Sequence, residues 1–170
     1  LDNPESGKKD CFYFKTFFCL FKLGDYAQAE EGFLKFEKEF KDSEYADDIL
    51  CNLILLYFEK QEYSKALDLS FDFTKRFGKS VLLSSVMFIQ ANIYQELNRF
   101  DDAKNIYKQI NSLFSDDSLV IRKTEFETAM LLFKMNKQEE ALNKIKALRG
   151  KYNDNEFNAK ILWWLGKYYY

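Results

Sequence analysis

The chain has 170 residues, of which 47% are hydrophobic and 18% are aromatic. A chain of this length can form one domain with a sizeable core, and its apolar content excludes an intrinsically disordered protein. The net charge is −2 and no window carries a basic stripe, which argues against a nucleic-acid binder, because such proteins neutralise phosphates with clustered cations. One proline and six glycines favour long helices over a β-sheet.

The chain divides into a short N-terminal segment and a repeated region. Residues 1–9 are expected to be disordered or to act as a linker, and residues 10–170 are expected to form a single all-α domain. In the segment 47–80, apolar residues recur at helical spacing over Asp47–Lys60 and again from Tyr63 to Phe77. This pattern predicts two antiparallel helices around a tight turn. The same pattern predicts repeats at 10–43, 47–80, 84–117 and 121–154, and a half repeat at 157–170.

Two columns of residues keep their spacing through all four repeats. One column is alanine and the other is aromatic, both with steps of 37, 37 and 38: Ala29, Ala66, Ala103 and Ala141, then Phe40, Phe77, Phe114 and Tyr152. We expect the alanines to lie where the paired helices cross, because only a methyl-sized side chain lets two backbones approach closely. A bulky residue there would overpack the crossing at a cost of about 1–3 kcal/mol.

Several of these segments resemble a known repeat family. Gly24-Asp25-Tyr26 with Ala29, and the segment 162–169, resemble the tetratricopeptide repeat, from about Asp10 onward. The resemblance implies a right-handed solenoid of helix pairs that binds other proteins. The small-residue position of the first helix falls at 17, 54, 91, 129 and 166, where Phe17 and Ile54 depart from the family pattern. We therefore expect looser or rotated packing in the first two repeats.

The step of about 37 and the linker 40–48 are similar to a bacterial envelope subgroup of this family. Its members include the TolA-binding cell-division coordinator and the barrel-assembly lipoprotein. The resemblance implies a periplasmic scaffold, or one anchored to a membrane and facing the periplasm. No run of 18 apolar residues is present, so no membrane span is expected, and a leader or anchor upstream of Leu1 stays open. The alternatives are a cytoplasmic chaperone or adaptor for a client protein, and a regulatory arm of a larger protein.

In a solenoid of helix pairs, the first helices line the concave face, which is the usual peptide-binding surface. The repeat spacing predicts a partner-binding groove with an apolar floor and a rim of mixed charge. Its residues are Phe14, Phe18, Phe21, Leu55, Phe58, Phe88, Asn92, Phe126, Met130, Phe133 and Trp163. The alternative is that many of these aromatic side chains pack against neighbouring helices and meet no partner.

One peptide-binding mode of the family is not expected in this chain. Chaperone-binding tetratricopeptide domains resemble one another in a clamp of Lys, Asn, Asn, Lys and Arg that holds a C-terminal carboxylate. The corresponding residues are Phe14, Phe18, Asn52, Ser85 and Ile89, of which only the asparagine matches.

The sequence predicts no enzyme, cofactor, metal site or small-molecule substrate. Histidine is absent, which removes the most versatile acid–base group and the commonest metal ligand. The phosphate loop, the serine elbow and the zinc-protease motif are all missing. The acidic pairs Asp47–Asp48, Asp101–Asp102 and Asp116–Asp117 each fall at or near a predicted helix start, where negative charge is favoured.

The three cysteines show no disulfide or metal-binding pattern. Cys11, Cys19 and Cys51 lie in apolar stretches without a C-x-x-C pair, so we expect reduced, buried thiols.

The predicted half repeat would leave an apolar end at Trp163, Trp164 and Tyr168, covered by further chain or by self-association. Light scattering that finds a strict monomer at high concentration would contradict self-association.

Overall fold

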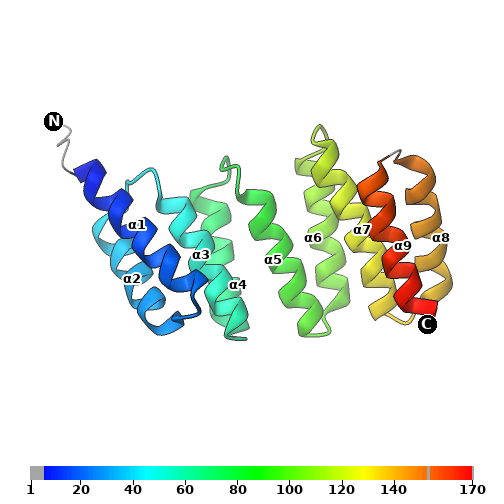
Figure 1. The fold of residues 1–170 in the computed structure, drawn as a ribbon, viewed down its shortest axis with the longest axis horizontal. Coiled ribbons are helices and arrows are strands. Elements are labelled where there is room, and N and C mark those ends of the chain that lie inside the picture. Colours follow the sequence, from blue (N-terminus) through cyan, green and yellow to red (C-terminus); the bar gives the residue numbers. More distant parts are fainter. Residues whose placement is uncertain (1–5, 153, 170) are drawn as a thin grey trace. The chain divides into compact units, whose positions relative to one another are not determined.

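The computed structural model describes residues 6–152 and 154–169, and the side chains of residues 9–152 and 154–166. Within these ranges every regular element is an α-helix, which confirms the predicted all-α class (Figure 1). The elements are α1 (Ser6–Lys22), α2 (Tyr26–Glu39), α3 (Ala46–Glu59), α4 (Tyr63–Arg76), α5 (Leu83–Glu96), α6 (Phe100–Leu113), α7 (Ser118–Lys134), α8 (Gln138–Lys151) and α9 (Asn155–Tyr169). None of the helices in the described part of the chain is long and apolar enough to cross a membrane.

The N-terminal boundary differs from the prediction. Helix α1 begins at Ser6, so the predicted linker over 1–9 is wrong for residues 6–9, and residues 1–5 lie outside the described residues. Lys8 and Lys9 are good helix formers, and nothing between Pro4 and Asp10 obliges the helix to stop. The helix therefore extends about one turn beyond its apolar face.

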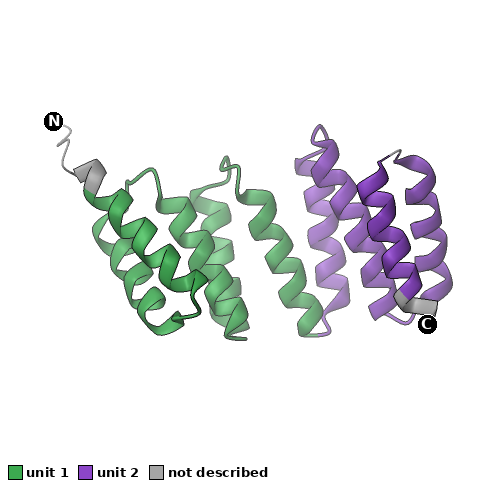
Figure 2. Cartoon of the chain, in the orientation of Figure 1, with its two compact units in different colours: residues 1–97 green, residues 98–170 purple. Residues whose placement is uncertain are grey.

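The chain divides into two compact units, residues 1–97 and residues 98–170 (Figure 2). In the first unit α1 packs on α2, α2 on α3, α3 on α4 and α4 on α5, and α3 also contacts α1 and α5. In the second unit α6 packs on α7, α7 on α8 and α8 on α9. Contacts in such a repeat are local, and the single domain predicted over 10–170 stays a prediction.

The turns inside the helix pairs share one backbone conformation. Gly24, Gln61, Asn98 and Asn136 all have positive φ, at 82°, 59°, 56° and 59°. After α1 the Asp25 N–H donates to the carbonyl of Leu20 at 3.0 Å, and the Gly24 N–H donates to Phe21 at 3.1 Å. This pair of bonds closes a helix end when the next residue is left-handed. It recurs after α3 and α7.

The aromatic column marks the ends of the second helices. Phe40, Phe77, Phe114 and Tyr152 are the C-terminal cap residues of α2, α4, α6 and α8. The N–H group of each donates to the carbonyl four residues earlier, at 2.7–3.0 Å. Each helix therefore ends at the same repeat position, although the proline that usually follows in the family is missing.

The alanine column is fully buried, and in α2, α4 and α8 it belongs to helices that pack on their pair partners. Ala29, Ala66, Ala103 and Ala141 are all 0% exposed. In the first helices, Ala91 and Ala129 are also 0% exposed, and so is the larger Ile54. Helix α3 therefore accommodates a branched side chain at the small-residue position without exposing it, and the looser packing expected at Ile54 is not observed.

Phe17 is accommodated by an exchange of size between two helices. Its ring lies in the space that a Cβ atom on Gly32 of α2 would occupy. The nearest ring carbon would be 2.1 Å from that atom, closer than non-bonded atoms can approach. It also stacks on Tyr13 with ring centroids 5.6 Å apart and meets Phe33 edge-on at 6.4 Å. Gly32 is buried, so the missing side chain on α2 makes room for the large one on α1. The first repeat is closely packed by this exchange rather than loose.

Neighbouring repeats are joined by a serine–aspartate hydrogen bond. The Ser43 hydroxyl, in the loop before α3, donates to Asp10 of α1 at 2.6 Å. The Ser80 hydroxyl, in the loop before α5, donates to Asp47 of α3 at the same distance. Both serine oxygens also accept a backbone N–H two residues later. Each bond links the first half of one first helix to the loop that precedes the first helix of the next repeat.

We expect Gly32→Ala to lower the free energy of unfolding by about 1 kcal/mol or more, because the new methyl group overpacks the Phe17 ring. Alanine is otherwise the better helix former by about 1 kcal/mol. The matched control is Gly150→Ala in α8, where an added Cβ meets nothing within 4 Å, and we expect it to be neutral or stabilising.

Urea denaturation measures both effects, alone and in a Phe17→Leu background. The smaller side chain should reduce the cost of Gly32→Ala, which a double-mutant cycle detects. Additive effects of the two substitutions would contradict the proposed exchange of size.

Candidate functional site

The predicted groove residues of the first unit lie on α1, α3 and α5. We call Phe14, Phe18, Leu55 and Phe58 the α1–α3 face. All four side chains are half-buried, and the two helices that carry them contact each other. Partly exposed apolar side chains on adjacent helices can still bind a partner, whereas fully buried ones cannot.

The aromatic residues of α1 are partly covered by the chain itself. Phe14 stacks on Tyr45, in the loop before α3, with ring centroids 4.9 Å apart. Phe18 lies 5.9 Å from Phe14, and the Lys22 ammonium lies 5.1 Å from the Phe18 ring centroid. Phe21 is buried against Phe33 of α2 and belongs to the core. Helical spacing does not predict that Tyr45, a linker residue, covers the Phe14 ring.

The predicted residues of α3 and α5 differ in how much surface they offer. Leu55 and Phe58 are half-buried, and the Phe58 ring lies 6.0 Å from the ring of Tyr63 at the start of α4. On α5, Phe88 is buried and Asn92 is exposed. Phe88, which was predicted to line the groove, therefore occupies a packing position in the core.

In the second unit the predicted residues lie on α7 and α9. Phe126 is buried in the core of this unit, edge-on to Phe157 at 5.9 Å. Met130 and Phe133 are half-buried against the same core. Phe133 packs on Trp164, with ring centroids 4.2 Å apart.

The end of α9 keeps some apolar surface. Trp163 is 62% exposed and Leu162 is 47% exposed, while Trp164 is half-buried. The side chain of Tyr168, which was also predicted to be exposed, lies outside the described residues. Self-association through this end stays a prediction.

A cavity of about 340 Å³ lies between the first halves of α7 and α9. We call it the α7–α9 cavity, and its size is at the lower end of that of ligand sites. Phe126 and Phe157, both buried, supply its aromatic lining, and most of the other lining residues are charged. The complete lining is Leu119, Arg122, Lys123, Phe126, Asp154, Glu156, Phe157 and Lys160. Only Phe126 was predicted, because helical periodicity does not describe the loop that brings Asp154 and the start of α9 to α7.

An ion pair holds the two walls of this cavity together. Arg122 of α7 donates to one carboxylate oxygen of Asp154, and the guanidinium carbon lies 5.0 Å from the Phe157 ring centroid. The other oxygen of Asp154 accepts the Phe157 N–H at 2.8 Å. The bond from the Phe157 N–H is the largest cause that lowers the pKa of Asp154 below its usual value, and the bond from Arg122 is the next. The start of α9 is thereby fixed to α7.

The acidic pairs have the predicted role at helix starts. Asp47 and Asp48 lie in the first turn of α3, and Asp101 and Asp102 lie in the first turn of α6. Asp117 caps α7 and accepts the N–H groups two and three residues later at 3.0 Å. No group of three or more metal-ligating side chains gathers anywhere in the described residues.

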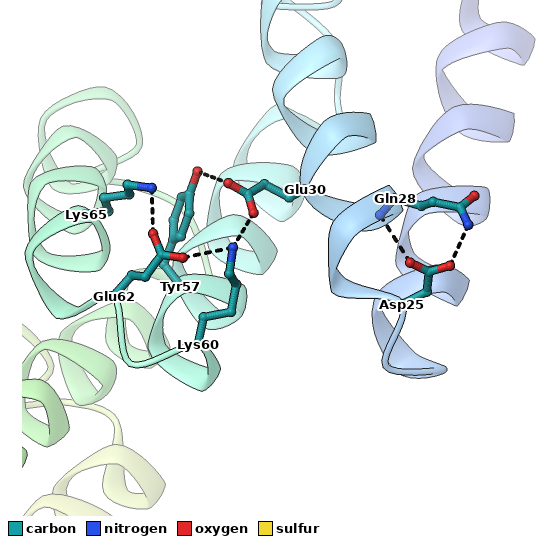
Figure 3. A network of polar contacts seen from close by, with 7 residues as sticks. All are labelled: Asp25, Gln28, Glu30, Tyr57, Lys60, Glu62 and Lys65. Carbon is teal, nitrogen blue, oxygen red and sulfur yellow. Dashed lines mark hydrogen bonds and ion pairs between the residues drawn. The ribbon is translucent and has the colours of Figure 1, made fainter.

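A polar network joins three helices of the first unit at the turn end (Figure 3). Glu30 of α2 accepts the Lys60 ammonium at 2.6 Å and the Tyr57 hydroxyl at 2.9 Å. Lys60 also pairs with Glu62 at 2.8 Å, and Glu62 pairs with Lys65 of α4. The bond from Lys60 is the main cause of the lowered pKa of Glu30, and burial raises the pKa of Tyr57 to about 12.

We expect this network to make unfolding sensitive to acid. Because the pKa of Glu30 is lower in the folded chain, its contribution is complete above the usual glutamate pKa and is lost as the pH falls through the folded value. Exposed ion pairs contribute about 1 kcal/mol or less. Lys60→Met should therefore reduce the loss of stability between about pH 6 and pH 3, measured by urea denaturation across that range.

The matched control is Lys38→Met, which removes an exposed lysine from α2. This variant should keep the pH dependence of the wild type. Parallel curves for the wild type and Lys60→Met would show that the network does not couple to protonation.

A family model described as tetratricopeptide repeat matches residues 85–117. These residues fall within the repeat predicted at 84–117 and include most of α5 and all of α6. Residues 85–117 therefore match a tetratricopeptide repeat, and the rest of the chain shares the all-helical architecture of that family. The fold supports a role as a scaffold for protein–protein interaction, because its stacked helix pairs present extended surfaces.

Solved structures of similar fold include several proteins with tetratricopeptide repeats. A tetratricopeptide repeat protein from Parabacteroides merdae ATCC 43184 matches with a TM-score of 0.65 and 14% identity, over 82% of this chain and 52% of that one. MamA AMB-1 matches with a TM-score of 0.58 and 20% identity, over 81% of this chain and 75% of that one. MamA MSR-1 matches with a TM-score of 0.57 and 21% identity, over 77% and 70%.

These comparisons define the fold and do not define a function. The chain spans about half the length of the Parabacteroides protein. All three identities are below 25%, so they show a shared architecture alone. No curated protein matches the sequence.

Proposed function

We propose that this tetratricopeptide-repeat protein is a non-catalytic scaffold that binds a segment of a partner protein on its first helices. The observation that carries the proposal is the α1–α3 face, where four apolar side chains on two adjacent helices stay half-buried. Such side chains lose water when a partner covers them, and aromatic residues dominate the energy of protein interfaces. The fold itself favours this use.

Charged residues beside this face support a peptide as the occupant. Lys15, Lys22 and Glu59 are exposed on the same helices. An apolar centre with a charged rim is the usual anatomy of a protein interface. In the second unit, Met130 and Phe133 of α7 offer a comparable half-buried surface.

The proposal is tested with peptides selected from a random library by the whole chain. Fluorescence anisotropy then gives the dissociation constant of the strongest peptide for the wild type and for Phe18→Ala/Phe58→Ala. We expect binding to weaken at least about tenfold, because truncated aromatic anchors each cost more than about 1 kcal/mol. Circular dichroism checks that the variant remains folded at the assay temperature.

The matched control removes apolar side chains of similar size from the second helices. Leu34 of α2 is 48% exposed and Phe71 of α4 is 53% exposed, so Leu34→Ala/Phe71→Ala should leave the affinity unchanged. If this control weakened binding and the α1–α3 variant did not, the partner would bind to the second helices and the groove assignment would fail. A selection that enriches no peptide would contradict the scaffold function itself.

We also propose that the protein works in the bacterial envelope, in the periplasm or anchored to face it. The support is the resemblance of the linker 40–48 to envelope members of the family. The alternative is a cytoplasmic adaptor. Protease treatment of spheroplasts that express the full-length protein separates the two, since only an envelope protein is digested while the inner membrane is intact.

A further inference from the structure

Helices α2 and α4 expose an apolar side chain at the same position of two successive repeats. Leu34 is 48% exposed, and Phe71, one 37-residue step later, is 53% exposed. The next residues in this series are Lys108 of α6 and Lys146 of α8, so the apolar pair belongs to α2 and α4. Single exposed apolar residues are common on protein surfaces, but these two are flanked by charges in a regular order.

Each of the two apolar residues lies between an acidic and a basic residue on one helix face. Positions three residues before and four residues after a given residue share its face of an α-helix. These positions are acidic before and basic after the apolar residue in both helices, and all of them are exposed. We call the six residues the α2–α4 face: Glu31, Leu34, Lys38, Asp68, Phe71 and Lys75.

Helices α2 and α4 are held side by side by polar contacts near both of their ends. Arg76 of α4 donates to Glu37 of α2 at 2.8 Å. Near the start of the two helices, the network from Glu30 to Lys65 joins α2 to α4 (Figure 3). Both helices follow the turn after a first helix and run in the same direction (Figure 1). The α2–α4 face therefore has three parallel rows: acidic, apolar and basic.

The charges of the α2–α4 face are not neutralised within the described part of the chain. Its two carboxylates and two ammonium groups take part in no ion pair among residues 9–152 and 154–166. Within one helix the acidic and the basic residue are separated by about 10 Å along the axis. Lys35, which follows Leu34, places its ammonium 5.7 Å from the ring centroid of Tyr13 of α1. The two charged rows therefore stay available to groups outside the chain.

Three rows in this order are complementary to the same three rows reversed. In a symmetric dimer one surface patch meets the same patch of the second copy. If the two-fold axis crosses α2 and α4 at the level of the apolar row, the helices of the two copies run antiparallel, and each acidic row meets a basic row. If the axis runs along the helices, acidic rows meet acidic rows, which is unfavourable. The charges therefore select the antiparallel arrangement.

We propose that the α2–α4 face binds a second copy of this chain and forms an antiparallel two-fold dimer. Leu34 and Phe71 lie at its centre, each against its counterpart, and each acidic residue faces the basic residue of the same helix in the second copy. The apolar centre supplies affinity, and the charged rows fix the orientation, because exposed ion pairs contribute little affinity by themselves. The interface uses second helices only, so the proposal does not depend on peptide binding at the α1–α3 face.

Sedimentation equilibrium of the whole chain measures the dissociation constant of the dimer. We expect a monomer–dimer equilibrium for the wild type and a dissociation constant at least about tenfold higher for Leu34→Ala/Phe71→Ala, because the central contacts are truncated. Circular dichroism checks that the variant remains folded. A wild type that is entirely monomeric at about 1 mM protein would overturn the proposal.

Charge-reversed variants test the pairing of the rows. Lys38→Glu/Lys75→Glu makes both rows acidic, and Glu31→Lys/Asp68→Lys makes both rows basic. We expect each variant alone to be monomeric at concentrations at which the wild type is dimeric, and an equimolar mixture of the two to form a dimer again. Either variant associating alone as strongly as the wild type, or a mixture that stays monomeric, would contradict the proposed pairing.

Two controls separate this surface from other parts of the chain. Lys108→Glu/Lys146→Glu makes the same change of charge on α6 and α8 and should keep the wild-type dissociation constant, as should Trp163→Ala at the exposed end of α9. If Trp163→Ala gave a monomer and Leu34→Ala/Phe71→Ala did not, the copies would meet at α9 and the proposal would be wrong. Since Leu34→Ala/Phe71→Ala should still bind selected peptides, failure of the dimer and failure of the proposed function are distinguishable.

Discussion

The close packing of the helix pairs α1–α2, α3–α4 and α7–α8, each with one buried alanine of the repeat, is the constraint on which the rest of the structure depends. Ala29, Ala66 and Ala141 in these pairs have no exposed surface. A close-packed interior leaves no space for a larger side chain at such a crossing. The turn inside each of these pairs and the aromatic cap after its second helix recur at the spacing of the repeat.

Local departures from the repeat are balanced by a second change nearby. Phe17 takes the place of a small residue on α1, and Gly32 on α2 supplies the missing space. Gln61 adopts the left-handed conformation that glycine has at 24 and asparagine has at 98 and 136. This conformation costs about 1–2 kcal/mol for an ordinary residue. The same left-handed residue therefore recurs in each turn of the repeat, whatever its side chain.

The sequence predicted the parts of the fold that depend on spacing along one helix. The alanine and aromatic columns, and the acidic residues at helix starts, follow from period and position, so they could be read directly. The same spacing gives the face on which a side chain lies but not how much its neighbours cover, and so Phe21, Phe88 and Phe126 proved to be buried. The α7–α9 cavity and the cover of Phe14 by Tyr45 depend on loop conformation. The bonds from Ser43 and Ser80 could have been found, because the two serines and their aspartates share the 37-residue step.

The central claim is tested most directly by placing the same large side chain at two alanines of α2. Ala29 is fully buried and Ala27, two residues earlier, is exposed, so Ala29→Leu and Ala27→Leu differ only in the face they enlarge. Urea denaturation should show a loss of about 1–3 kcal/mol for Ala29→Leu and a change within about 0.5 kcal/mol for Ala27→Leu. Equal free energies of unfolding for the two variants would contradict the claim that the helix crossing sets the structure.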